Sequence, residues 1–145
     1  METTSSAPQL ASRLRLAVAR TARRLRQEAG GGLSPTLSAA LASVDKHGPL
    51  TPSELADRER VKRPTATRLL ATLEEGGLVA RTSDPSDRRS SLIAVTPAGH
   101  DLLRTMRTRK DAYLAQRLDK LTVDERETLA RAADLLERLL EEDHA

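Results

Sequence analysis

Residues 61–77 combine cations and hydroxyls in a pattern suited to contact with nucleic acid. Read as a helix, VKRPTATRLLATLEEGG places apolar residues at i, i+3, i+4 and i+7 on one face. The opposite face carries long cations and short hydroxyls, with no carboxylate before Glu74. Such side chains can bond base edges in a major groove and the phosphates beside it. The candidate contact residues are Lys62, Arg63, Thr65, Thr67, Arg68 and Thr72.

Charge along this segment differs from that of an ordinary solvated helix. Outer faces normally mix both signs, because opposite charges four residues apart stabilise a helix and like charges destabilise it. Here the acids occur only in the last turn, so the earlier turns present a positive, donor-rich surface. We therefore interpret the segment as a recognition helix. The alternative is a core helix whose exposed side is basic without functional consequence.

A short helix is predicted just before the basic one. Thr51-Pro52-Ser53-Glu54 supplies a hydroxyl N-cap, proline at the first helical position and glutamate at the third, as in a capping box. The charged run 57–60 closes this helix, and Gly76-Gly77 ends the basic helix. Two helices separated by a tight turn, the second of them basic, indicate a helix-turn-helix.

A hairpin with a cationic tip is expected next. Residues 78–82 and 91–95 are strand-like, and the loop 84–89 between them carries Arg88 and Arg89. Helix, turn, basic helix and hairpin together predict a winged helix-turn-helix at 34–96. The fold class is then mainly α (α+β).

Helical patterns flank this predicted head. The last one carries an apolar band wider than one flat partner needs, so it should contact both its own chain and another copy. We expect residues 9–33 and 97–142 to form a helical dimerisation base, and residues 1–8 to form a disordered tail. The predicted helices outside the head are 9–29, 97 to about 120, and about 123–142, and the first helix of the head begins at Ser34-Pro35.

One turn of the helix that starts at residue 97 breaks its apolar pattern. Arg107, Thr108, Arg109 and Lys110 interrupt the stripe, and Lys110 falls where an apolar residue is expected. Two interpretations remain open. The turn is either locally exposed to solvent or borders a ligand cavity.

Composition limits the protein class. Of 145 residues, 1% are aromatic, from Tyr113 alone, so the core must use Leu, Ala and Val, and such a small chain often completes its burial in a partner subunit. The absence of Cys excludes a disulfide framework, a thiolate zinc site and a cysteine redox switch. No apolar run approaches the roughly 18 residues of a membrane span, and residues 1–7 are too polar for a signal peptide. We expect a cytoplasmic, nucleoid-associated protein.

Charge is segregated along the chain. The net charge is only +3, which by itself says little about nucleic acid. Residues 58–72, however, hold five cations and one acid, whereas residues 121–145 hold three arginines and eight acids. The chain therefore has a basic reading end and an acidic terminal helix.

Three segments are similar to the MarR family of bacterial regulators. Leu55-Ala56, the run 61–68 and the run 73–79 resemble the core of that family, and DPSDRR at 84–89 followed by 92–99 resembles its wing. The resemblance spans about 34–103. It implies a homodimer whose recognition helices enter the major groove of an inverted-repeat operator, with the wing in a neighbouring minor groove.

The resemblance also assigns roles to single residues. Lys62, Arg63, Thr65, Thr67 and Arg68 match the positions of base and phosphate contacts. Arg89 matches the family's minor-groove arginine, which Asp87 would hold, and Arg88 would meet phosphate. Lys62 departs from the Ser or Thr common in the family, so the helix lacks its usual side-chain N-cap at a cost of about 1 kcal/mol.

A small-molecule effector, often aromatic and anionic, is a further implication of the resemblance. Its cleft would lie between the dimer base and the reading head, and the regulator would act as a repressor that the effector releases. By position alone, the effector-binding candidates are Arg13, Arg20, Ala40 and His100.

Catalytic and metal chemistry find no support in the sequence. The three His residues are far apart, no glycine-rich phosphate loop is followed by Lys-Ser/Thr, and no G-x-S-x-G is present. We expect no enzyme activity, no cofactor and no metal site. The alternative function is a winged-helix module that binds an adaptor protein without binding DNA.

Overall fold

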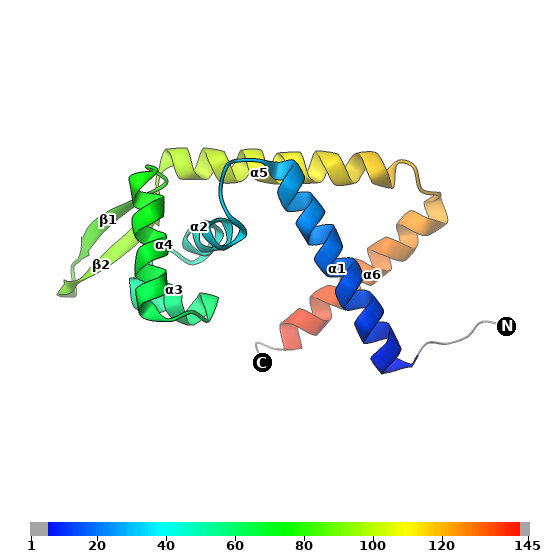
Figure 1. Cartoon of the computed structure of the whole chain (residues 1–145), viewed down its shortest axis with the longest axis horizontal. Coiled ribbons are helices and arrows are strands. Elements are labelled where there is room, and N and C mark those ends of the chain that lie inside the picture. The colour runs from blue at the N-terminus through cyan, green and yellow to red at the C-terminus, as the bar shows by residue number, and fades with distance from the viewer. Residues whose placement is uncertain (1–5, 143–145) are drawn as a thin grey trace. The chain divides into compact units, whose positions relative to one another are not determined.

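The computed structural model describes residues 6–142, except the side chain of Arg88, and has the predicted mainly helical fold with one small antiparallel sheet (Figure 1). The chain divides into two compact units, one ending at Lys110 and the other starting at Asp111. The elements are α1 (Ala7–Ala29), α2 (Pro35–His47), α3 (Pro52–Glu59), α4 (Arg63–Glu75), β1 (Val79–Asp84), β2 (Asp87–Val95), α5 (Pro97–Leu118) and α6 (Val123–Glu142).

Helix starts in the head follow the capping residues seen in the sequence. The Ser34 hydroxyl accepts a hydrogen bond from the Leu37 amide at the start of α2, and the Thr51 hydroxyl accepts one from the Glu54 amide at the start of α3. The return bond of the predicted capping box differs, because Glu54 Oε1 accepts from the Thr51 hydroxyl. Both helices carry Pro at the first position, where its missing N–H costs nothing.

The start of α1 corrects the predicted tail. Ser6 and Gln9 form a reciprocal capping box, so α1 begins at Ala7 instead of Gln9. Residues 6–8 of the tail expected at 1–8 are therefore the cap and first turn of a helix. Residues 1–5 lie outside the described part of the chain.

The hairpin is longer than predicted. Its register pairs Val79 with Val95 and continues to Asp84 opposite Asp87, with an irregularity between Ser83 and Asp84. The expected loop 84–89 therefore shrinks to a two-residue turn. The Asp84 carboxylate closes this turn by accepting hydrogen bonds from the amide and hydroxyl of Ser86. Arg88 and Arg89 consequently belong to β2 and not to a loop.

A single aliphatic core joins α2, α3, α4 and the hairpin. Leu41, Leu55, Leu70 and Ile93 are completely or almost completely buried in it. The segment before α3 also pairs with the sheet, since Leu50 and Ile93 exchange backbone hydrogen bonds of 2.9 and 2.8 Å. The core thus anchors both α4 and the base of the hairpin.

The second unit consists of the end of α5 and α6. Thr122 caps α6 by accepting from the Glu125 amide, while Glu125 accepts from the Thr122 amide, as the sequence predicts. Arg126 Nη1 donates to the Leu118 and Leu121 carbonyls at 3.2 and 2.7 Å, which fixes the junction. Among the described helices, none is long and apolar enough to cross a membrane.

Candidate nucleic-acid interface

The burial of α4 decides which of its residues are available to a ligand. Ala66, Leu70 and Leu73 are buried in the core, as their helical spacing predicts. Five of the six candidate contact residues on the opposite face are exposed, and Thr65 is half-buried. The exposed candidates on α4 and at its cap are Lys62, Arg63, Thr67, Arg68 and Thr72.

The turn between α3 and α4 sets the direction of the candidate recognition helix. Arg60 has φ 54° in the left-handed region, and its amide donates to the Ala56 and Asp57 carbonyls. The Val61 amide then donates to the Ala56 carbonyl at 3.0 Å. These bonds end α3 and turn the chain into α4 within three residues, 60–62.

The N-terminus of α4 carries positive charge that no side-chain cap offsets. Lys62 occupies the N-cap position and makes no side-chain capping bond, in agreement with the predicted loss of the usual hydroxyl cap. The first amides of a helix lack intrahelical acceptors and lie at the positive end of its dipole. Together with the Lys62 and Arg63 side chains, they can stabilise a phosphate here.

The acid at the far end of α4 is already paired. Glu74 Oε2 lies 3.0 Å from Arg81 Nε on β1, in an exposed ion pair. Such pairs contribute at most about 1 kcal/mol to stability. The effect of this ion pair is electrostatic. Arg81 neutralises the charge of Glu74, the first carboxylate of the helix, so the face before it stays positively charged.

Side-chain bonding within α4 separates its hydroxyls. The Thr72 hydroxyl donates to the Arg68 carbonyl at 3.1 Å, so that in this arrangement it can only accept from a ligand. No such bond engages Thr67 among the described residues. Thr67 can therefore donate to a phosphate or to a base acceptor.

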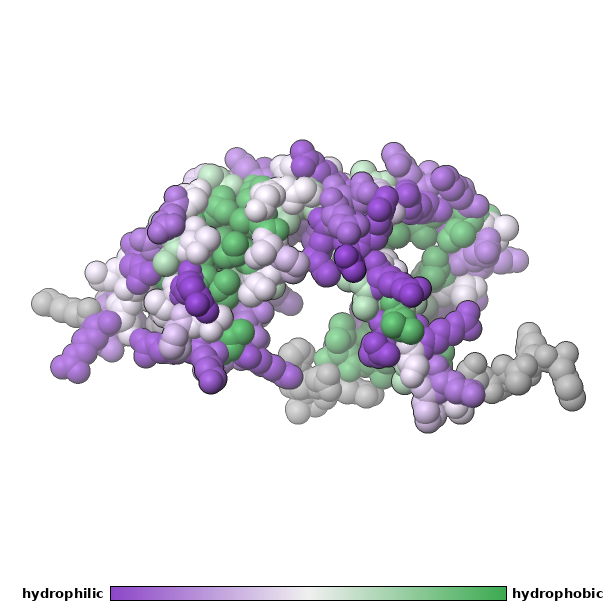
Figure 2. Space-filling view, in the orientation of Figure 1, coloured by the Kyte–Doolittle hydropathy of each residue, from purple (hydrophilic) through white to green (hydrophobic). Residues whose placement is uncertain are grey.

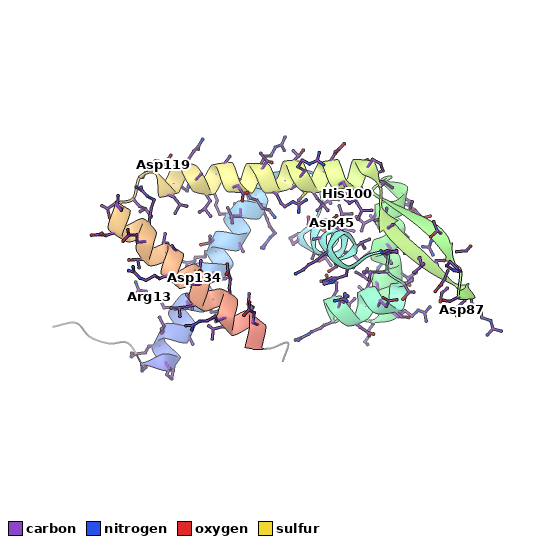
Figure 3. All side chains as sticks on the ribbon, turned by 180° about the vertical axis from the view of Figure 1, so that it is seen from behind. Arg13, Asp45, Asp87, His100, Asp119 and Asp134 are labelled. Atoms are coloured by element: carbon purple, nitrogen blue, oxygen red, sulfur yellow. The ribbon has the colours of Figure 1, made fainter. Side chains whose placement is uncertain are left out.

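Carboxylates organise the tip of the hairpin, which Figure 3 shows at Asp87. The Ser86 hydroxyl and amide, both donating to Asp84, hold the pKa of that carboxyl below its ordinary value. Asp87 Oδ1 accepts from the Arg89 amide at 3.0 Å. Asp87 thus supports the main chain of Arg89 and not its guanidinium group. The Arg89 side chain is exposed.

The base of the hairpin is fastened to both α4 and α5. The Thr96 hydroxyl donates to the Gly77 carbonyl at 2.6 Å and accepts from the Gly99 amide at 3.1 Å. The Thr96 amide donates to the Leu78 carbonyl at 3.0 Å. The end of the candidate recognition helix, the hairpin and the start of α5 therefore form one bonded junction.

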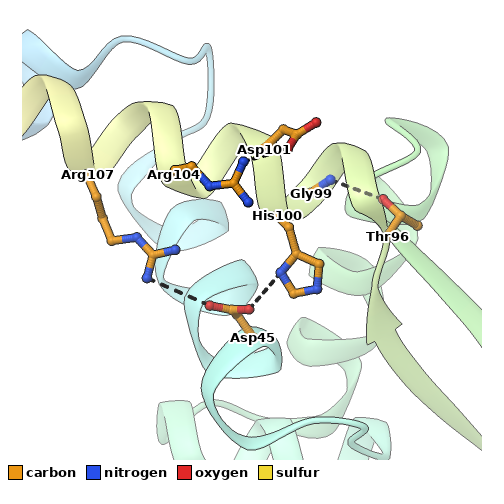
Figure 4. A network of polar contacts seen from close by, with 7 residues as sticks. All are labelled: Asp45, Thr96, Gly99, His100, Asp101, Arg104 and Arg107. Atoms are coloured by element: carbon orange, nitrogen blue, oxygen red, sulfur yellow. Dashed lines mark hydrogen bonds and ion pairs between the residues drawn. The ribbon is translucent and has the colours of Figure 1, made fainter.

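The four effector candidates do not converge. Arg13 and Arg20 are exposed on α1, and Ala40 is completely buried in the aliphatic core, where it offers no surface to a ligand. His100 Nδ1 lies 3.0 Å from Asp45 Oδ1, and Asp45 Oδ2 lies 4.0 Å from Arg107 Nη1 (Figure 4). These contacts join α5 to α2.

Two adjoining cavities were not located by the sequence reasoning. They have volumes of about 300 and 340 Å³ and share Ser38 and Met106 in their walls. Arg107, Thr108 and Arg109 are exposed, and Arg107 and Lys110 line the larger cavity, so the turn is exposed to solvent and also borders a cavity. The interruption of the apolar stripe at residues 107–110 was the signal in the sequence that could have located these cavities. The cations of the two walls are Arg23, Arg26, Lys46, Arg107 and Lys110.

Comparison with known proteins decides the class. The model of the MarR family matches residues 33–91. An HTH-type transcriptional regulator of Mycobacterium leprae is 40% identical over 134 residues, covering 92% of this chain and 94% of that protein. The chain belongs to the MarR family. It is a DNA-binding transcriptional regulator and not an enzyme.

Solved structures agree with the fold of this MarR-family protein. A transcriptional regulator of Pseudomonas aeruginosa is 34% identical, with a TM-score of 0.85 over 95% of this chain and 98% of its own. A mutant of MepR from Staphylococcus aureus, solved bound to an oligodeoxyribonucleotide, is 22% identical, with a TM-score of 0.70 over 95% of this chain and 99% of its own. The second likeness concerns the fold alone.

Proposed function

We propose that this regulator binds an inverted-repeat operator as a homodimer and represses the genes beside it. The observation that carries the proposal is the exposed face of α4, whose cations precede any carboxylate and whose first acid, Glu74, pairs with Arg81. Lys62, Arg63 and the start of the helix contact phosphate, while Arg68 and Thr67 reach base edges. The MepR mutant solved with an oligodeoxyribonucleotide supports this use of the fold.

The hairpin contributes a second contact. Arg88 and Arg89 lie on β2 next to its turn, and Asp87 holds the Arg89 main chain. An arginine can enter a narrow minor groove, where the negative potential is high. The hairpin therefore adds affinity through the backbone and minor groove, and α4 supplies most of the base readout.

Homodimerisation is supported by apolar surface that the described chain leaves exposed. On α6, Leu135, Leu139 and Leu140 are 52%, 57% and 66% exposed. Leu10 and Val18 on α1 are about half exposed as well. Large apolar side chains that repeat along an exposed helix can form a patch, and such patches usually mark protein–protein contacts. A two-fold dimer spaces its recognition helices one DNA turn apart, about 34 Å, and requires an inverted repeat.

The effector is expected to be a small anion, aromatic in part. The two cavities between α1, α2 and α5 are of the size that binds small molecules, and their walls combine Met106 and Leu103 with several cations. An anion bound at Arg107 and Lys110 competes with Asp45 for Arg107. It would thereby weaken the Asp45–Arg107 contact between α2 and α5 and change the geometry of the head.

Titration of DNA binding with salt tests the proposal. Affinity for duplex fragments selected from the source genome is measured by fluorescence anisotropy at several salt concentrations. Log affinity should fall linearly with log salt, by about 0.9 for each phosphate contacted. Binding to DNA that is independent of salt, or equal for selected and random duplexes, would contradict sequence-specific recognition by α4.

A further inference from the structure

The basic segment 58–72 contains five cations and a single acid, and the proposed DNA contact makes no use of the acid. This acid is Glu59, the last residue of α3. Lys62, the N-cap of α4, follows three residues later, so the Cα atoms of the two residues lie at most about 11 Å apart. The Debye length at 0.1 M salt is about 10 Å, so a carboxylate free to move at this position would oppose the binding of phosphate.

The Glu59 carboxylate is turned toward α2. Its Oε1 accepts a hydrogen bond from the hydroxyl of Ser43, a residue of α2 that lies 16 residues earlier in the chain. Glu59 and Ser43 are both half-buried, whereas Arg58 and Arg60 are exposed. Hydrophilic side chains project from the edge of the head that α3 forms (Figure 2). The one acid of the basic segment is therefore partly enclosed between α2 and α3, while its cationic neighbours face solvent.

The charge of Glu59 is held by this hydrogen bond and is not neutralised by an ion pair. The ion pairs of the described residues do not involve Glu59. Desolvation lowers the pKa of His47 at the end of α2, and the charges of Arg58 and Lys46 lower it further. The opposing effect of Glu59 on this pKa is smaller. The cations therefore outweigh the carboxylate at the ends of α2 and α3.

The Ser43–Glu59 bond also lies next to the turn that leads into α4. Glu59 directly precedes Arg60, whose left-handed backbone, with φ 54°, ends α3. Released from Ser43, the carboxylate can rotate into solvent beside the exposed start of α4. It would there compete with phosphate for the side chains of Lys62 and Arg63, since both partners offer charged oxygen acceptors.

We propose that Ser43 is a positioning residue for DNA binding. Its hydroxyl holds the Glu59 carboxylate toward α2 and thereby keeps the start of α4 positively charged. The inference rests on the proposed function, from which it takes the contact of Lys62 and Arg63 with phosphate. The alternative is a bond that stabilises the packing of α2 on α3 and leaves DNA binding unchanged. The charge of Glu59 separates the two, because only the proposal makes the effect of losing Ser43 depend on that charge and on salt.

A double-mutant cycle tests the proposal. Ser43→Ala removes the donor, whereas Glu59→Gln removes the charge and keeps an oxygen that can accept from Ser43. Affinity for a random-sequence duplex and for duplexes selected from the source genome is measured by fluorescence anisotropy. At about 0.05 M salt, Ser43→Ala should weaken both at least about threefold, the effect of one unit charge about 6 Å from a phosphate in water. Combined with Glu59→Gln, the same substitution should have little effect, because no charge is released.

Asp57→Asn is the matched control for the loss of charge. It removes an exposed carboxylate from the same turn of α3 and leaves both partners of the Ser43–Glu59 bond in place. Combined with Ser43→Ala, it should not restore the lost affinity to the extent that Glu59→Gln does. The loss caused by Ser43→Ala should also become smaller at about 0.3 M salt, because screening weakens a charge effect but not a defect in packing.

Each outcome decides for or against the proposal. Unchanged affinity of the Ser43→Ala protein overturns it, and so do equal losses with and without the charge of Glu59, because the bond would then act through packing alone. If Ser43→Ala fails to fold by circular dichroism, Glu59→Gln gives the answer. A carboxylate held toward α2 affects DNA only weakly, so its removal should raise affinity by less than about threefold at about 0.05 M salt, and a larger rise overturns the proposal.

Lys62→Ala distinguishes failure of this proposal from failure of the proposed function. It should weaken binding to both kinds of duplex and make the salt slope of log affinity shallower by about 1. Unchanged binding would place the start of α4 away from DNA and contradict the proposed function itself. Weakened binding in this variant, together with unchanged binding in Ser43→Ala, contradicts only the role of Ser43.

Discussion

Gly99 at the start of α5 is the position where one added methyl group should disturb the head most. A Cβ at this residue would lie 2.2 Å from the Leu78 carbonyl oxygen and 2.7 Å from Val95 Cγ1. Non-bonded atoms of this kind normally stay well over 3 Å apart, so Gly99→Ala must move the backbone just before β1 by about 1 Å. That shift strains the bond from the Thr96 amide to the Leu78 carbonyl, now 3.0 Å.

The magnitude follows from three opposing terms. Overpacking of this kind costs typically about 1–3 kcal/mol. Loss of the Thr96–Leu78 hydrogen bond adds about 1 kcal/mol. Alanine gains about 1 kcal/mol over glycine in a helix. The free energy of unfolding should therefore fall by about 1–3 kcal/mol.

Urea unfolding at one fixed protein concentration measures this change, since the stability of any protein that dimerises depends on its concentration. Gly76→Ala is the matched control. Its added Cβ meets only ordinary contacts of 3.6 Å or more, and its φ of −76° suits alanine. The control should be as stable as the unmodified protein, or more so. Unchanged stability of the Gly99→Ala protein would show that the head accommodates the added methyl group without strain.

Three other substitutions test the interface and its support. Arg68→Ala should weaken operator binding by about 1–3 kcal/mol and random-duplex binding by less, as measured by anisotropy; equal losses would make it a phosphate contact. Replacing Arg88 and Arg89 by Ala should make the salt slope of log affinity shallower by about 1–2 units, and an unchanged slope would place the hairpin away from DNA. Ser86→Ala should raise the pKa of Asp84 toward its ordinary value in an NMR titration, because the Ser86 hydroxyl is the main cause of the lowering. Because folding lowers the pKa of the Asp84 carboxyl, its ionised form stabilises the turn at a pH above the pKa of the unfolded chain. This stabilisation is lost as the pH falls through the folded-state pKa. In the Ser86→Ala protein that pKa is higher, so the turn should loosen at a higher pH.

Local patterns predicted the head because its determinants are local. The caps at Ser34 and Thr51 are short-range bonds, and the apolar spacing of α4 fixes which face is buried. The hairpin was harder. The polar run 84–89 indicates a loop, yet the Asp84 carboxylate closes a turn of two residues and extends both strands.

Sites assembled from distant segments were the part that local patterns could not predict. The cavity walls combine residues of α1, α2 and α5. The one sign of them in the sequence was Lys110, which occupies a position where the helical pattern calls for an apolar residue. Position alone suggested Ala40, but its small side chain fits completely inside the core. His100 was suggested in the same way, and the structure shows it bound to Asp45.

Selection of DNA fragments from the source genome, followed by their sequencing, shows whether the regulator recognises a specific inverted repeat. The purified full-length regulator is mixed with sheared genomic DNA at moderate salt, and the bound fragments are sequenced. We predict one enriched motif, an inverted repeat whose half-sites are centred about 10–10.5 base pairs apart, as two α4 helices in successive major grooves require. Bound fragments with no common sequence, or with a single half-site that is never repeated, would contradict it.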